Sequence, residues 1–442
     1  MTIRMDEGAA ELLDTLHRAG YAAYVVGGCV RDSLLGLTPH DWDLCTSALP
    51  QQGMELFGEE KCIPTGLQHG TVTVKQGGGL YEITTFRTEG TYTDGRHPDE
   101  VHFVPDVRED LARRDFTINA MAYNEKEGLV DPFGGQADLQ SGILRAVGVP
   151  HQRFTEDALR ILRLYRFAAR FGFSIDPPTA QAAQELCAHL DCVSVERIEE
   201  ELAKLLSAPA PAAYLDEKIL GVVLPELSPE ALAAAKPVVD ACPAGERALP
   251  VRLAALLLSL GEDGTRRTLR RLRCSNACIE ETAVLVREVV SGVPGAFSSD
   301  TNRAIPSPAL LPAATGSHPS GRSSEKLPAR PPVSLNIYTR KLLGQYGLKT
   351  VQRLAALGTA LQPEHAADFA ALSELAERLD ADGVCCRVSQ LAVNGRDLMA
   401  AGVPSGPGIR KVLEALLDGV IREEYPNERQ ALLTAVQQLA AS

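Results

Sequence analysis

The sequence predicts an α+β protein in which a small mixed-sheet domain is followed by a long series of helices. Short β-type runs and glycine turns are concentrated in the first third of the 442 residues. From about Thr155 the chain is rich in Ala, Leu, Glu and Arg at helical spacing. Because 45% of the residues are apolar, the chain has enough material for a sizeable core.

Composition excludes several classes of protein. A formal net charge of −13 argues against a protein that coats nucleic acid nonspecifically, although it allows a local basic groove. None of the ten cysteines has zinc-type spacing, and a chain this long needs no disulfides, so we expect reduced thiols and a cytoplasmic location. We also expect no signal peptide and no membrane span, because no suitable apolar run occurs.

The first third contains the β-type segments. Residues 1–20 are predicted to form an amphipathic helix, and residues 21–26 a strand that ends at Gly27–Gly28. A short helix is expected at 30–35. Residues 69–74 and 81–86 are predicted strands on either side of a run of glycines, and their proximity predicts an antiparallel hairpin.

The remainder is predicted to be helical, with one interruption. Thr155 is a good candidate for a helix N-cap, because Glu156 and Asp157 follow it and would favour the helix dipole. Residues 291–334 are rich in Pro, Ser and Gly and lack apolar periodicity, which predicts a disordered insertion.

A possible metal and phosphate site lies in the first domain. A double glycine after a strand lets backbone N–H groups approach an anion, and Arg31 adds donors suited to phosphate oxygens. Asp41 and Asp43 are two residues apart, so in an extended segment they share one face. Mg²⁺ prefers carboxylate and phosphate oxygens, and two such ions can promote an in-line phosphoryl displacement. Glu82 either completes the metal site or faces solvent.

Arginines recur along one predicted helix. Spacings of three, three and four residues place them on one stripe: Arg160, Arg163, Arg166 and Arg170. Stacked like charges destabilise a helix, so an anion is expected beside them. A triphosphate or an RNA backbone would serve, and so would acidic residues elsewhere in this acidic chain.

Asp157 and Arg160 are three residues apart and are expected to be adjacent. Together they offer an acceptor and planar donors. The exocyclic amine of cytosine or adenine would donate to Asp157, and ring acceptors would bind Arg160. Guanine and uracil present the wrong pattern, so this pair predicts base selection without a nucleic-acid template.

Together these motifs resemble those of the class II tRNA nucleotidyltransferases, which comprise CCA-adding enzymes and bacterial poly(A) polymerases. The matching segments are residues 27–32 (GGCVRD), 41–43 (DWD), 113–120 (RRDFTINA) and 156–160 (EDALR). Residues 65–74 and the loop at 86–99 are most similar to the CCA-adding enzymes, and so are residues 394–398 and 406–408 near the C-terminus. The insertion at 291–334 departs from the family pattern.

The resemblance implies a domain order and a set of functional residues. It implies a nucleotidyltransferase head (1–145), a helical neck that selects the nucleotide (146–210), a helical body (211–290) and, after the insertion, a body and tail that bind tRNA (335–442). It implies that Asp41 and Asp43 bind Mg²⁺, with Glu82 as a further catalytic candidate. The implied nucleotide-binding residues are Gly28, Arg31, Arg114, Asp157, Arg160, Arg163 and Arg166.

The implied reaction is addition of C, C and A to the 3′ end of tRNA from CTP and ATP, with release of pyrophosphate. A poly(A) polymerase and a catalytically inert RNA-binding relative are the alternatives. An arginine cluster is a candidate for tRNA phosphate contacts or an ordinary solvated helix: Arg266, Arg267, Arg270, Arg271 and Arg273. Arg410–Lys411 is a second candidate for phosphate contact.

Overall fold

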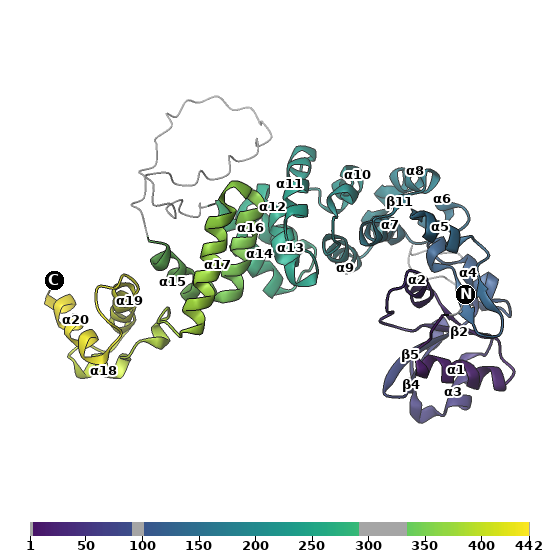
Figure 1. The fold of residues 1–442 in the computed structure, drawn as a ribbon, viewed down its shortest axis with the longest axis horizontal. Helices are drawn as coiled ribbons and strands as arrows, with labels where there is room; N and C mark the ends of the chain where they lie inside the picture. The colour runs from purple at the N-terminus through teal and green to yellow at the C-terminus, as the bar shows by residue number, and fades with distance from the viewer. Residues whose placement is uncertain (1–2, 91–100, 291–333, 442) are drawn as a thin grey trace. The chain divides into compact units, whose positions relative to one another are not determined.

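The protein is described here by a computed structural model that covers residues 3–90, 101–290 and 334–441. The chain divides into two compact units, Met1–Pro225 and Glu226–Ser442. The α+β class predicted from the sequence is confirmed. The large sheet belongs to the first unit, and the described part of the second unit is helical (Figure 1).

A seven-stranded mixed sheet forms the core of the first unit, in the order β3-β4-β5-β2-β1-β8-β9. Within this sheet the β2–β5 pair is parallel and the other pairs are antiparallel. All four residues of β1 are buried, as expected for a central strand covered on both faces. The strands are β1 (Ala23–Val26), β2 (Leu44–Thr46), β3 (Cys62–Gly66), β4 (Thr71–Gln76), β5 (Gly79–Thr85), β8 (Ala122–Asn124) and β9 (Gly128–Val130).

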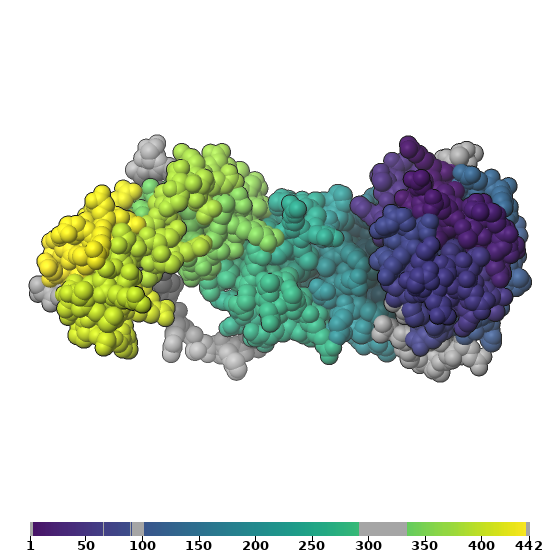
Figure 2. Space-filling view, turned by 90° about the horizontal axis from the view of Figure 1, so that it is seen from below, coloured from purple at the N-terminus to yellow at the C-terminus, as the bar shows by residue number. Residues whose placement is uncertain are grey.

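Local sequence signals explain several of these elements. The helix predicted in residues 1–20 is α1 (Glu7–Arg18), which begins after Asp6, where the carboxylate accepts hydrogen bonds from two backbone N–H groups. The predicted β4–β5 hairpin is confirmed, and its turn contains Gly77 and Gly78 at positive φ. The purple and dark blue part of the first unit, which holds α1 and this hairpin, forms one continuous mass (Figure 2).

The remaining elements of the first unit include short helices and two small strand pairs. The strand pairs are β6 (Arg87–Glu89) with β7 (Val101–Phe103), and β10 (Ile143–Leu144) with β11 (Ser174–Ile175). Part of the predicted loop at 86–99 lies outside the described residues. The other helices are α2 (Gly28–Leu34), α3 (Pro50–Phe57), α4 (Val107–Ala112), α5 (Gly135–Ser141), α6 (Pro150–Glu156), α7 (Leu159–Phe171), α8 (Pro177–Leu186), α9 (Val195–Leu206) and α10 (Glu217–Val223).

The helix start predicted at Thr155 is wrong. Pro150 begins α6, and this helix runs through Thr155 to Glu156. Asp157 then adopts extended backbone angles (φ −146°, ψ 102°) and interrupts the helical path. Ala158 is the N-cap of α7, three residues later than predicted, and the carboxylate of Asp157 accepts a hydrogen bond from the first N–H of that helix, on Leu159, at 3.1 Å.

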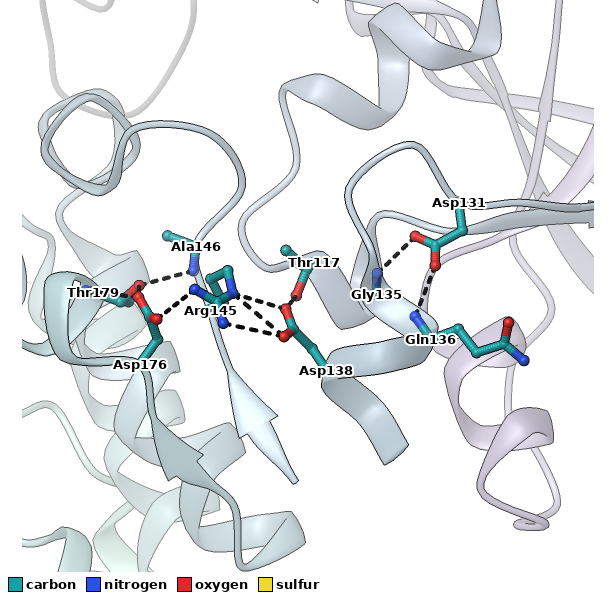
Figure 3. Close-up of polar contacts among 9 residues, drawn as sticks. All are labelled: Thr117, Asp131, Gly135, Gln136, Asp138, Arg145, Ala146, Asp176 and Thr179. Carbon is teal, nitrogen blue, oxygen red and sulfur yellow. Dashed lines mark hydrogen bonds and ion pairs between the residues drawn. The ribbon is translucent and has the colours of Figure 1, made fainter. Parts of the chain in front are cut away.

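Arg145 joins three segments of the first unit (Figure 3). Its guanidinium pairs with Asp138 of α5 at 3.1 Å and with Asp176, the N-cap of α8, at 2.5 Å. Asp138 also accepts a hydrogen bond from the hydroxyl of Thr117 at 2.7 Å. Thr117 begins the 3₁₀ turn η3 (Thr117–Asn119), so this network links that turn to two helices.

Helices make up the described part of the second unit. A hydrophobic cluster that includes Leu398, Leu416 and Leu432 packs its C-terminal helices together. The predicted insertion at 291–334 lies outside the described residues except for Ser334, the N-cap of α15. No helix in the described residues is long and apolar enough to cross a membrane. The helices are α11 (Pro229–Ala241), α12 (Leu249–Leu257), α13 (Gly261–Arg271), α14 (Asn276–Val290), α15 (Leu335–Tyr346), α16 (Leu348–Leu361), α17 (Ala366–Ala381), α18 (Gly395–Ala400), α19 (Pro407–Ile421) and α20 (Arg429–Ala441).

Gly135 allows α5 to pack closely on η3, which predicts an effect on stability. A Cβ at this position would lie 2.2 Å from the carbonyl oxygen of Thr117, a backbone atom that cannot rotate away. Gly135→Ala should therefore destabilise the first unit by about 1–3 kcal/mol, measured by urea unfolding. Gly53→Ala is the matched control, because it lies within α3 and its Cβ would meet nothing within 4 Å. The control should be neutral or stabilising by up to about 1 kcal/mol, and equal stability of the two variants would contradict the packing argument.

Candidate active site

The glycine turn after β1 has a backbone shape that requires glycine. Gly27 has φ 77° and ψ −121°, which side chains rarely adopt. A Cβ there would also lie 3.0 Å from Nη1 of Arg114, so the missing side chain lets that guanidinium reach the turn. The predicted short helix after the turn is present as α2, but it begins at Gly28, two residues earlier than expected. The structure thus places Arg114 beside Gly27, and Arg31 beside Gly28, where a Cβ would lie 3.6 Å from its Nη2.

Asp41 and Asp43 lie immediately before β2, in an irregular segment with both side chains exposed. The backbone N–H of Val26 donates to the carbonyl of Asp43 at 2.9 Å, which fixes this segment beside the end of β1. The pairing of Leu44 with Ile83 in parallel strands places Asp43 next to Glu82. The predicted carboxylates therefore gather at neighbouring strand positions.

The carboxylates are close enough to influence one another electrostatically. Loss of surrounding water raises the pKa of Asp43, and the negative charges of Glu82 and Asp41 raise it further, while Arg114 opposes them. Among the described residues, however, no group of three or more His, Cys, Asp or Glu side chains has an arrangement that could hold a metal ion. Glu82 is thus an electrostatic neighbour of Asp43 without forming a ready three-carboxylate cage.

Arg31 is buried beneath the glycine turn, with only 4% of its surface exposed. Its Nε donates to Asp32 at 2.8 Å and its Nη1 donates to the side-chain oxygen of Asn119 at 2.5 Å. The guanidinium carbon also lies 4.9 Å from the ring centroid of Phe171, within cation–π range. The protein itself thus supplies partners for Arg31, although burial still lowers the pKa of its guanidinium and Asp32 also pairs with Arg170.

Arg114 is held differently. Its Nη2 donates to the buried carboxylate of Asp110 at 3.2 Å. Its Nε is buried without a hydrogen-bond partner among the described residues. Burial alone would lower its pKa, but the charges of Asp110 and Asp43 contribute to a net increase, so Arg114 stays a cation. This arginine joins the glycine turn to the carboxylate region electrostatically.

The arginine stripe is present on α7, and each of its members has a carboxylate partner. Arg160 pairs with Glu156 at 2.6 Å, and Arg170 pairs with Asp32 at 3.2 Å. Arg163 and Arg166 share Glu201, a carboxylate of α9 that is only 4% exposed. The sequence left three anions open for these arginines: a triphosphate, an RNA backbone or acidic residues of the chain. In this structure acidic side chains of the protein balance their charge.

Asp157 and Arg160 do not pair with each other. Asp157 accepts two hydrogen bonds from Arg197 of α9, at 3.2 and 2.7 Å. Arg160 donates to Glu156 and to the backbone carbonyls of Arg153 and Arg113. The two side chains are therefore fixed separately, which leaves them available to face a third group.

Sequence reasoning did not assign roles to Asp115, Asn119, Arg197 or Glu201. Asp115 accepts from Arg163 at 2.7 Å and from the amide of Asn119 at 3.0 Å, and Asn119 in turn binds Arg31. Asp115 and Asn119 lie within the RRDFTINA segment on which the family resemblance rests, so this motif could have indicated a role for them. Arg197 and Glu201 are four residues apart on one helix face, but nothing in the sequence pointed to their partners on α7.

Some of the basic residues of the second unit form ion pairs with neighbouring carboxylates. Arg266 pairs with Glu262 and Glu280, and Arg271 pairs with Glu226. Arg267 and Arg270 are exposed on α13, while Arg273 follows the helix with a left-handed φ of 57°. The second predicted basic site is near the start of α19, where Arg410 pairs with Glu414 at 2.8 Å. Both features remain surface candidates for phosphate contact.

Comparison with known proteins identifies the family. Family models match in three segments: a "Poly A polymerase head domain" at residues 23–145, a "Probable RNA and SrmB- binding site of polymerase A" at 172–230, and a "tRNA nucleotidyltransferase domain 2 putative" at 337–436. The CCA-adding enzyme of Lactiplantibacillus plantarum is 35% identical over 99% of this chain and 97% of its own length. The chain belongs to the CCA-adding enzymes. Its predicted nucleotidyltransferase activity is thereby confirmed.

Solved structures of the family agree in fold over the whole chain. The Bacillus stearothermophilus CCA-adding enzyme in complex with CTP has a TM-score of 0.78 and 30% identity, and the match covers 99% of this chain and 98% of that one. The Thermotoga maritima CCA-adding enzyme complexed with tRNA shares the fold, with a TM-score of 0.61 and 21% identity. Metal dependence is a property of this family.

The buried ion pair between Asp115 and Arg163 predicts a pH-dependent contribution to stability. Burial alone raises the pKa of a carboxyl, but Arg163 and Asn119 lower that of Asp115 to about 2. Since this is below the unfolded value of about 3.9, the stabilisation is present above about pH 4 and is lost as the pH falls towards 2. Asp115→Asn should cost about 2 kcal/mol at pH 6 in urea unfolding, and the difference from the native enzyme should shrink below pH 4.

Asp14→Asn is the control for that measurement. Asp14 forms an exposed pair with Arg18 on α1, so its removal should change stability little at either pH. A cost of Asp115→Asn that is the same at pH 6 and pH 3 would contradict the assignment.

Proposed function

We propose that this CCA-adding enzyme adds C, C and A to the 3′ end of tRNA, using CTP and ATP and releasing pyrophosphate at each step. The observation that carries the residue assignment is the position of Asp41 and Asp43 beside the Gly27–Gly28 turn and Arg114. A triphosphate at the turn would place its α-phosphate within reach of groups held by these carboxylates. The attacking group is the terminal hydroxyl of the tRNA.

We propose Mg²⁺ as the metal and Asp41 and Asp43 as its protein ligands. The residues fit this ion, because they supply the hard oxygen donors that it prefers and because their mutual repulsion is relieved by a cation. Bound there, the ion would lower the cost of deprotonating the 3′-hydroxyl and neutralise charge on the leaving pyrophosphate. Glu82, beside Asp43, adds negative potential that favours cation binding, and this is the catalytic role proposed for it.

The triphosphate is proposed to bind at the glycine turn and along α7. Backbone N–H groups at Gly28 can approach an anion closely because no side chain intervenes. Arg31 lies under the turn with its own partners, so its proposed contribution is positive potential and support of the turn. Arg114, Arg163 and Arg166 supply further positive charge, and a bound triphosphate would compete with Glu201 for the last two.

Asp157 and Arg160 are proposed to read the base. Oδ2 of Asp157 accepts one hydrogen bond among the described residues, from Arg197, and so keeps a free lone pair for an exocyclic amine. Arg160 uses Nη1 twice and Nη2 once, which leaves Nε–H and one Nη2–H without a partner in the described part of the chain. An acceptor beside two donors complements cytosine and adenine.

Features outside the catalytic region support two further proposals, the cytoplasm as the location of the enzyme and tRNA as the acceptor of the nucleotides. All ten cysteines are free thiols, which supports the proposal that the enzyme acts in the cytoplasm. The match to the tRNA nucleotidyltransferase domain at 337–436 supports tRNA as the acceptor, held in part by the second unit. The exposed arginines of α13 are proposed to contact its phosphates.

Incubation of tRNA lacking its 3′ CCA with CTP and ATP tests the activity. We expect three nucleotides to be added, after which extension stops. Continued addition of A to tRNA or to unstructured RNA would identify a poly(A) polymerase instead. Asp41→Ala and Asp43→Ala should each lower incorporation roughly 1,000-fold or more while tRNA binding by gel shift persists. Asp14→Ala, on the exposed face of α1, should leave incorporation unchanged, and full activity in Asp41→Ala would refute the metal assignment.

Replacement of the base-reading pair should change which nucleotides are accepted. Asp157→Ala and Arg160→Ala are each expected to reduce the preference for CTP and ATP over UTP and GTP by about tenfold or more, because each removes a hydrogen bond made to the correct bases. The measurement is kcat/KM for each nucleotide with the same tRNA. Unaltered discrimination in both variants would show that the base is read elsewhere.

A further inference from the structure

Helix α9 presents two charged residues to α7, one turn apart on the same face. Arg197 pairs with Asp157, and Glu201 pairs with Arg163 and Arg166. The helices pack directly on each other. Helix α9 therefore holds three residues of the proposed nucleotide site. Its cation, Arg197, binds Asp157, and its anion, Glu201, binds Arg163 and Arg166.

Asp157 needs such an anchor because of where it lies. It falls in the break between α6 and α7, with extended backbone angles; its backbone N–H and carbonyl bond to the two helices, but these bonds do not orient its carboxylate. Apart from Arg197, the carboxylate accepts one hydrogen bond among the described residues, from the N–H of Leu159 to Oδ1 at 3.1 Å. A carboxylate held through one oxygen can still rotate about its last side-chain torsion, which has broad preferences.

The contact with Arg197 removes that freedom. Nη1 of Arg197 donates to Oδ1 at 3.2 Å and Nη2 donates to Oδ2 at 2.7 Å, so the planar guanidinium binds both oxygens. Oδ1 then accepts two hydrogen bonds, from Arg197 and from Leu159, while Oδ2 accepts one. Each carboxylate oxygen has about two lone-pair sites, so Oδ2 is the oxygen with acceptor capacity left.

We infer that Arg197 is a positioning residue for base selection: it fixes the Asp157 carboxylate so that Oδ2 faces the base as an acceptor. This inference rests on the proposed function, in which Asp157 reads the exocyclic amine. Arg197 reaches the base only through Asp157. Without Arg197 the Asp157 carboxylate remains but can rotate. Cytosine and adenine then lose an acceptor that is held in position for them, and uracil and guanine are rejected less strongly.

Arg197→Met in the full-length enzyme tests this role. With tRNA lacking CCA, kcat and KM are measured for CTP and for UTP separately. We expect the ratio of kcat/KM for CTP to that for UTP to fall about tenfold or more, with the melting temperature little changed. Arg197→Lys should retain part of the discrimination, because an ammonium can bind one oxygen but lacks the planar fork.

Lys204→Met is the matched control. Lys204 lies on the same helix, is exposed, and pairs with Glu200 at 2.7 Å, so its loss removes a cation from α9 away from Asp157. Discrimination should be unchanged in this variant. If Arg197→Met lowers kcat/KM for CTP and UTP equally, or leaves their ratio within about twofold of the native enzyme, the positioning role is overturned.

A double-mutant cycle separates this inference from the proposal on which it rests. If Arg197 acts through Asp157, Arg197→Met should cause no further loss of discrimination in the Asp157→Ala background. Discrimination that persists in Asp157→Ala refutes base reading by Asp157, and the inference fails with it. Discrimination lost in Asp157→Ala but kept in Arg197→Met refutes only the role of Arg197.

Discussion

The proposed nucleotide site of the first unit depends on the pairing of buried and half-buried arginines with buried carboxylates. A charge removed from water is costly unless an opposite charge and hydrogen bonds compensate it. Arg31 with Asp32 and Arg163 with Asp115 combine an ion pair with a hydrogen bond, and Arg166 forms an ion pair with Glu201, so charges from four segments of the chain are paired. Phe167 and Phe171 add aromatic faces beneath the same guanidinium groups. Each segment is therefore held by charges that the others supply.

This pairing has a consequence for an anionic substrate. The arginines of α7 already have carboxylate partners. The net binding free energy of a triphosphate is therefore only the difference between its attraction to these arginines and the attraction of the carboxylates that it replaces. The deepest pairs are hard to exchange, because separating them leaves a buried charge alone. Burial lowers the pKa of Arg166 to about 10, which shows that water solvates this charge poorly even with Glu201 beside it. The site is thus preorganised and keeps its cations in place before a nucleotide arrives.

Sequence reasoning succeeded where chemistry is local. The glycine turn and the arginine stripe are each contained within a short segment, and the spacing of the arginines alone indicated that they share one face of α7. It failed where the outcome depends on distant partners. Strand β2 has only three residues, too short for a periodic signal, and its parallel register with β5 places Asp43 beside Glu82. The Asp157–Arg197 pair joins residues 40 apart in the chain, and no local pattern predicts it.

The helix break at Asp157 shows why the failed prediction matters for function. Had α7 begun after Thr155, Asp157 would be a first-turn residue whose carboxylate lies along the helix axis with Arg160 one turn away. The break instead turns the carboxylate towards α9, and it separates Asp157 from Arg160 so that neither neutralises the other. A pair bonded to itself would have little capacity left for a base. In the proposed base selection both partners are held from outside, so a wrong base would leave an acceptor and donors unsatisfied, and such unpaired polar groups make hydrogen-bonded sites selective.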